Sequence, residues 1–122
     1  MFEQFGRPSS GGVTWVWARA DLEMATVARA RIELSAVVTL MRGPGNVLVF
    51  LGHECFVDLR GLRLLVDTAR RVRALDGALA VVAPPRCLKR LMQVGHVDTE
   101  LPLVPTARQA AWWVRTHGTG LL

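Results

Sequence analysis

The sequence has little cysteine, a single lysine and no long hydrophobic stretch. Its longest apolar runs, residues 47–51 and 77–83, reach only strand length, whereas a helix that spans a bilayer needs about 20 apolar residues. Residues 1–12 (MFEQFGRPSSGG) lack the basic segment, apolar core and cleavage site of a secretory signal. We therefore expect a cytoplasmic protein with no membrane insertion.

The two cysteines, Cys55 and Cys87, are too few for a disulfide framework, and their spacing is unlike that of a metal site. His53 and His96 add two scattered candidate ligands, which fall short of the four that a structural zinc site needs. We expect no metal and no other cofactor. The two thiols are expected to be reduced and partly buried, although a redox role for them stays open.

The net charge of +5 comes almost entirely from arginine, since Lys89 is the only lysine. A nucleic-acid interface would gather these arginines on one face with aromatic residues between them, but the sequence scatters them. We therefore expect no specific nucleic-acid partner. Adjacent tryptophans cannot all face a core, and Trp112 is our candidate for a partner patch or for self-association as a homodimer.

Strand and helix patterns alternate along the 122 residues, of which 51% are hydrophobic, enough for one core. Short apolar or alternating runs predict strands at residues 13–20, 47–51, 78–82 and 101–104. Apolar residues at three- and four-residue steps predict helices that begin after Thr26 and Asp58. The Pro84-Pro85 break and Gly95 bound a short helix from residue 86 to about residue 94, and a last helix begins after Thr106. Thr26 is a candidate cap, and Thr106 with Gln109 forms a capping box.

This alternation predicts an α/β fold with a mainly parallel sheet of four to five strands, residues 47–51 at its centre, and about four helices. We expect one domain over residues 13–116. Residues 1–12 are rich in turn residues and are expected to be flexible, and residues 117–122 are expected to be a frayed tail.

In parallel sheets, binding sites lie at the carboxyl ends of strands, and the loop at residues 52–61 (GHECFVDLRG) is the best candidate here. Residues 56–62 read F-V-D-L-R-G-L ahead of a helix, which resembles the core signature of STAS domains, the anti-sigma-factor antagonist family. Residues 20–26 (ADLEMAT) and 43–51 resemble further segments of that family. The resemblance covers roughly residues 13–113.

The resemblance implies a regulatory protein and not an enzyme: it would bind a kinase-like anti-sigma factor and so release a sigma factor. It also implies a docking face formed by the loop around Asp58, the helix over residues 61–75 and the early loop at residues 21–26. Our candidate contact residues are Glu23, Asp58, Leu59, Arg60, Gly61 and Arg63. In the family a serine follows the aspartate and is phosphorylated, but Leu59 occupies that position, and residues 52–67 contain no Ser, Thr or Tyr. Phosphorylation of this loop is therefore not expected to regulate the protein.

Other interpretations stay open. A STAS subunit of a transporter or of a larger signalling complex would use the same helix face. A small nucleotide-binding or enzymatic domain is a further alternative, although no P-loop or dinucleotide glycine pattern follows any predicted strand. Individual residues also have structural interpretations: Asp58 as a helix cap, Gly61 as a site of close packing and Leu62 as core, with Leu59 and Arg60 exposed.

Overall fold

The computed structural model describes residues 2–5, 13–41, 45–52, 54–95 and 100–117. A single sheet runs in the order β1-β2-β3-β4-β5. Its strands are β1 (Phe2–Phe5), β2 (Val13–Ala18), β3 (Asn46–Phe50), β4 (Ala78–Val82) and β5 (Leu103–Val104). The helices are α1 (Val27–Met41), α2 (Leu59–Ala74), α3 (Arg86–Gly95) and α4 (Ala107–His117).

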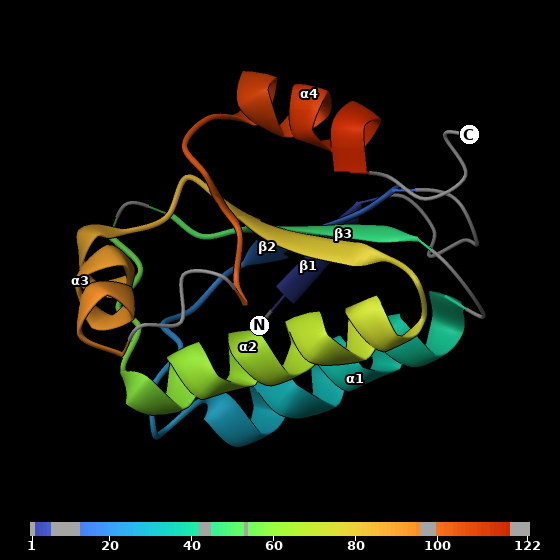
Figure 1. Ribbon diagram of the computed structural model, residues 1–122. Coiled ribbons are helices and arrows are strands. Elements are labelled where there is room, and N and C mark those ends of the chain that lie inside the picture. The colour runs from blue at the N-terminus through green and yellow to red at the C-terminus, as the bar shows by residue number, and fades with distance from the viewer. Residues whose placement is uncertain (1, 6–12, 42–44, 53, 96–99, 118–122) are drawn as a thin grey trace.

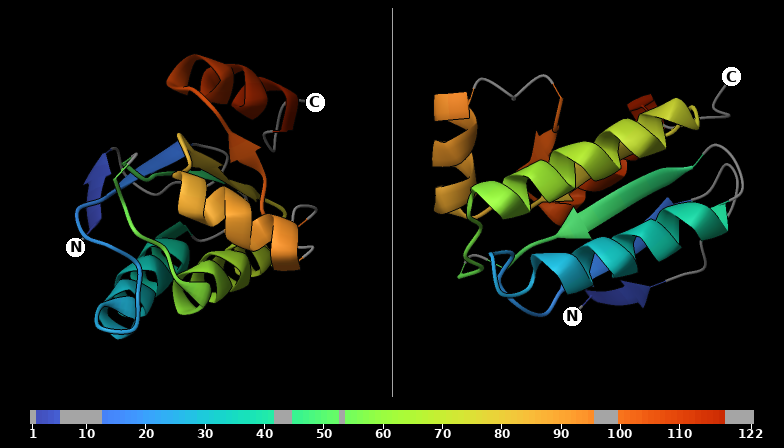
Figure 2. Two further views of the ribbon diagram at one scale, coloured as in Figure 1. Left: turned by 90° about the vertical axis from the view of Figure 1, so that its left-hand side faces the viewer. Right: turned by 90° about the horizontal axis from the view of Figure 1, so that it is seen from below.

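Strands β2 to β5 are parallel, while β1 pairs with β2 in the antiparallel direction. Helices α1 and α2 lie side by side under one face of the sheet, α4 covers part of the other face, and α3 lies at one end (Figures 1 and 2). This arrangement confirms the predicted α/β class, the mainly parallel sheet and the four helices. The central position predicted for residues 47–51 is also confirmed, because β3 lies between β2 and β4.

The core has two parts because successive strand residues point to opposite faces of the sheet. The larger part lies between the sheet and the helices α1 and α2, and it includes Val49, Leu34 and Leu65. The smaller part lies under α4 and includes Leu48 and Trp113. Strand β3 is buried on both faces, which is why its sequence is an uninterrupted apolar run.

Strand β1 corrects the prediction that the whole of residues 1–12 is flexible and outside the domain. Residues 2–5 form a strand because they pair with the free edge of β2, with Phe2 opposite Ala18. The Phe2 N–H also donates to Oε1 of Glu33 on α1 at 3.0 Å, and Phe2 packs against the larger core. A four-residue segment carries too little local pattern for this to be predicted. Residues 6–12 and 118–122 lie outside the described residues.

Helix α4 begins where the capping box predicts. The Gln109 N–H donates to the Thr106 hydroxyl at 3.2 Å, while the Gln109 side-chain oxygen lies 3.4 Å from the same hydroxyl. Next to each other on this helix, Trp113 is buried at 8% exposure and Trp112 is exposed at 58%. The prediction that adjacent tryptophans split between core and surface is therefore confirmed.

Replacing Thr106 with alanine is expected to lower the free energy of unfolding by about 1 kcal/mol, because one N–H of the first turn of α4 loses its acceptor. Urea denaturation followed by circular dichroism measures this change. Thr106→Ser keeps the acceptor and serves as the control. Equal losses in both variants would contradict the capping role.

Candidate functional site

Two loops whose bonded residues are 34 to 36 positions apart in the sequence pack together at the carboxyl ends of β2 and β3. We call residues 21–26 and 55–61 the double loop. Leu22 and Val57 form an isolated parallel bridge, in which the Leu22 N–H donates to the Phe56 carbonyl at 2.8 Å and the Asp58 N–H donates to the Leu22 carbonyl at 3.0 Å. The early loop (residues 21–26) therefore pairs with the signature loop (residues 55–61) through backbone hydrogen bonds, as a short parallel strand would.

The Asp58 carboxylate holds both parts of the double loop. Its Oδ1 accepts from the Gly61 N–H at 3.0 Å, which caps α2 as predicted. Its Oδ2 accepts from the Met24 N–H at 3.0 Å, a contact that the sequence did not predict. Arg60 lies 3.9 Å from the same oxygen, an exposed pair of the kind that adds little stability.

Asp21 and Thr26 complete the double loop. Oδ1 of Asp21 accepts from the Phe56 N–H at 2.9 Å. The Thr26 hydroxyl accepts from the Glu23 N–H at 3.1 Å and donates to the Asp21 carbonyl. The Thr26 hydroxyl therefore bonds to backbone groups of the loop and not to the N–H groups in the first turn of α1. The prediction of Thr26 as a side-chain cap is wrong.

Gly61 allows the two loops to approach this closely. A Cβ atom at position 61 would collide with the carbonyl oxygen of Leu22 and lie 2.8 Å from the Leu22 Cβ. The interpretation of Gly61 as a close-packing residue is confirmed, and Leu62 beside it is in the core at 3% exposure.

Three large apolar side chains on the double loop face solvent. Met24 is 68% exposed, Phe56 48% and Leu59 55%. Of the predicted site residues, Leu59, Arg60 and Arg63 are exposed, Glu23 and Asp58 are partly exposed and Gly61 is buried. Sequence reasoning missed Met24 and Phe56, because neither belongs to a periodic pattern that separates core from surface.

The first hydroxyl after the signature loop is not available for modification. Thr68 is 4% exposed, and its hydroxyl donates to the Leu64 carbonyl at 2.7 Å within α2. The sequence has no other hydroxyl between residues 52 and 68. Residues 52–67 therefore contribute no hydroxyl group to the double loop, and the hydroxyl of Thr68 is buried.

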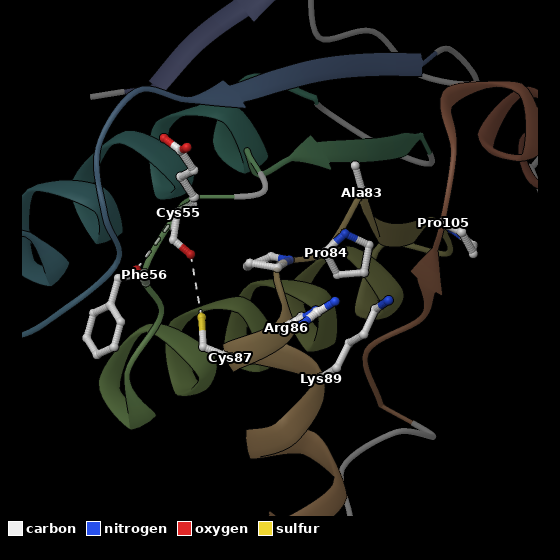
Figure 3. A pocket seen from close by; sticks show the side chains of 10 residues that line it. Cys55, Phe56, Ala83, Pro84, Arg86, Cys87, Lys89 and Pro105 are labelled. Carbon is white, nitrogen blue, oxygen red and sulfur yellow. Dashed lines mark hydrogen bonds between the residues drawn. The ribbon is translucent and has the colours of Figure 1, made fainter.

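A pocket of about 520 Å³ opens next to the double loop at the ends of β3, β4 and β5 (Figure 3). Its lining includes Cys55 and Phe56 from the loop, and Arg86, Cys87 and Lys89 from the start of α3. Among the described residues, no three His, Cys, Asp or Glu side chains are grouped to hold a metal. His53 and His96 lie outside those residues. None of the helices in the described part of the chain has the length and hydrophobicity that crossing a bilayer requires.

Solved structures resemble the fold over nearly its whole length, whereas no protein-family model and no curated protein matches the chain. An anti-sigma-factor antagonist (STAS) domain protein from Planctomyces limnophilus is 22% identical, with 92% of this chain and 96% of that chain covered and a TM-score of 0.75. This chain has the STAS fold. An anti-sigma factor antagonist from Mycobacterium paratuberculosis is 24% identical, with coverages of 94% and 95% and a TM-score of 0.74.

The STAS fold also includes the anti-sigma factor antagonist SpoIIAA in its unphosphorylated form. It is 16% identical to this chain, with coverages of 95% and 97% and a TM-score of 0.67. SpoIIAA from Bacillus is likewise known in a phosphorylated form, with a TM-score of 0.60 to this chain. These likenesses show a shared fold. The double loop occupies the strand ends where α/β sheets commonly bind their ligands.

Proposed function

We propose that this protein is an anti-sigma-factor antagonist. It binds an anti-sigma factor through the double loop and the start of α2, and this binding frees a sigma factor without any catalytic step. The likeness to solved anti-sigma-factor antagonists over more than nine-tenths of the chain supports the proposal. Of the predicted residues, we assign the contacts to Glu23, Leu59, Arg60 and Arg63, together with Met24 and Phe56, while Asp58 and Gly61 hold the two loops in position.

The observation that carries this proposal is the group of exposed apolar side chains on a rigid support. Met24, Phe56 and Leu59 lie on backbone that is fixed by the Asp58 carboxylate and by the Leu22–Val57 bridge. Large apolar side chains that are held in place lose little conformational freedom on binding, which favours their use as anchors in an interface. Arg60 and Arg63 lie at the same end of α2 and supply a basic border.

The proposed partner is a kinase-like anti-sigma factor, but the double loop has no serine for it to phosphorylate. A phosphate at this helix N-terminus would add nearly two negative charges and repel a partner. Leu59 has no hydroxyl group that could accept a phosphoryl group, and Arg60 gives this surface a positive charge where a phosphate would give a negative one. We therefore propose that binding is not switched by phosphorylation of residues 52–67, so adding ATP leaves the complex intact.

Replacing Leu59 with glutamate is expected to weaken binding to the anti-sigma factor at least about tenfold, because a charge is forced into an apolar contact. The purified chain is titrated into each kinase-like anti-sigma factor encoded in its source genome, alone and in complex with its sigma factor. Displacement of the sigma factor is followed in the same titrations.

Leu40→Glu is the matched control. Leu40 is 56% exposed, almost the same as Leu59, and lies in the last turn of α1. The Leu40→Glu protein should bind the anti-sigma factor with the affinity of the wild type. Binding of none of these factors by the wild type, or equal weakening by the two substitutions, would contradict the proposal.

A further inference from the structure

The two cysteines, 32 positions apart in the sequence, meet at the wall of the pocket beside the double loop. The Cys87 thiol donates to the Cys55 carbonyl at 3.5 Å, and the Val57 N–H donates to Sγ of Cys87 at 3.4 Å (Figure 3). The sulfur of Cys87 therefore lies against the backbone of residues 55–57, directly before Asp58. These two hydrogen bonds connect the start of α3 to the signature loop.

The environments of the two thiols differ. Burial, and next the negative charge of Asp21, raises the pKa of the Cys55 thiol to about 11, so this thiol stays protonated at neutral pH. Its sulfur lies 3.7 Å from the Ala20 carbonyl. Cys87 is the second residue of α3 and lines the open pocket with Arg86 and Lys89. A small oxidant that enters this pocket can therefore reach Cys87, and the deprotonated form of a cysteine is the reactive one.

We propose that Cys87 and Cys55 form a reversible disulfide when the protein meets a peroxide. The Cys87 thiolate attacks the O–O bond, which gives a sulfenic acid on Cys87 and a hydroxide that is protonated to water. The Cys55 sulfur then attacks the Cys87 sulfur, the S–O bond breaks, and the thiol proton leaves with the hydroxide as a second water. Two thiols are oxidised and one peroxide is reduced.

The bond closes by a rotation of the Cys55 side chain. In the reduced structure the Cys55 sulfur lies 3.7 Å from the Ala20 carbonyl, so the bond requires this side chain to turn away from Ala20 and toward the Cys87 sulfur, which contacts the Cys55 carbonyl at 3.5 Å. A disulfide would then join residue 55 to the start of α3. Disulfides in reducing compartments are typically transient and redox-sensing, which fits a pair at an open pocket.

The regulatory part of this proposal rests on the proposed function. The disulfide would lie one residue from Phe56 and three from Asp58, so its formation changes the backbone that presents the docking residues. Val57 would lose the thiol that its N–H contacts at present. Oxidation thereby supplies a switch at the loop where the phosphorylatable serine is replaced by Leu59.

The chemical step is tested on the purified full chain alone. Reduced protein is treated with hydrogen peroxide, digested without reductant and mapped by mass spectrometry. We expect a Cys55–Cys87 cross-linked peptide pair that dithiothreitol removes. In Cys55→Ser, a sulfenic acid on Cys87 should accumulate and react with dimedone. In Cys87→Ser, Cys55 should remain a thiol.

Three results would overturn the chemical step: no cross-link in folded wild type, cross-links only between chains, or dimedone labelling of Cys55 in Cys87→Ser. The regulatory part is tested by comparing the affinities of oxidised and reduced protein for the anti-sigma factor, where we expect a change of about tenfold. The double serine variant should not respond to peroxide. An unchanged affinity would overturn regulation, whereas failure of reduced wild type to bind would overturn the proposed function and leave the disulfide result standing.

Discussion

Replacing Gly61 with alanine is expected to lower the free energy of unfolding by about 3 kcal/mol. The added methyl group collides with the backbone carbonyl of Leu22, and neither loop can move without breaking the Leu22–Val57 bridge. Helix propensity alone predicts the opposite sign, because alanine is favoured over glycine inside a helix by about 1 kcal/mol. The sign of the change therefore separates close packing from propensity, and urea denaturation measures it.

Gly52→Ala is the matched control for this experiment. A Cβ at position 52 meets no atom within 4 Å, so its stability should change by less than about 1 kcal/mol. A stabilised Gly61→Ala protein, or equal changes at the two positions, would show that the loops are not packed as closely as described.

Replacing Asp58 with alanine is expected to cost about 3 kcal/mol. The helix cap accounts for about 1 kcal/mol, and the charge-assisted bond to the Met24 N–H for about 2 kcal/mol more. Asp58→Asn should give an intermediate loss, because its remaining oxygen can still accept from the Gly61 N–H while its amide nitrogen cannot accept from Met24.

Hydrogen exchange at single amides distinguishes these two contributions. The Met24 amide should exchange faster in both variants, and the Gly61 amide should exchange faster only in Asp58→Ala. Equal stability and equal exchange in the two variants would contradict the double role of this carboxylate. The bond to the Met24 N–H would then account for the whole effect, and the cap of α2 for none of it.

Asp58 shows how structural and functional roles coincide at this site. Its carboxylate is committed to two backbone N–H groups, so its main effect on a partner is indirect. It fixes the positions of Met24 and Leu59, which are exposed. We therefore expect substitutions at Asp58 to affect stability and binding together, and substitutions at Leu59 to affect binding alone.

The amino-acid sequence by itself determined the local features of this protein. Short apolar runs placed β3 and β4, apolar periodicity placed α1 and α2, the Pro84-Pro85 break placed α3, and the capping box placed α4, because each of these signals is local in the sequence. The capping role of Asp58 followed from its position directly before α2. The lack of a phosphorylatable residue in the loop is a property of the sequence alone.

Only the tertiary structure decided which distant segments meet. The bond between Met24 and Asp58 joins residues 34 positions apart, and β1 exists because β2 has a free edge beside it. The contact of Cys87 with Cys55 likewise depends on where α3 starts relative to the signature loop. Local propensity carries no information about such pairs, because their geometry is set by the packing of the whole sheet and its helices.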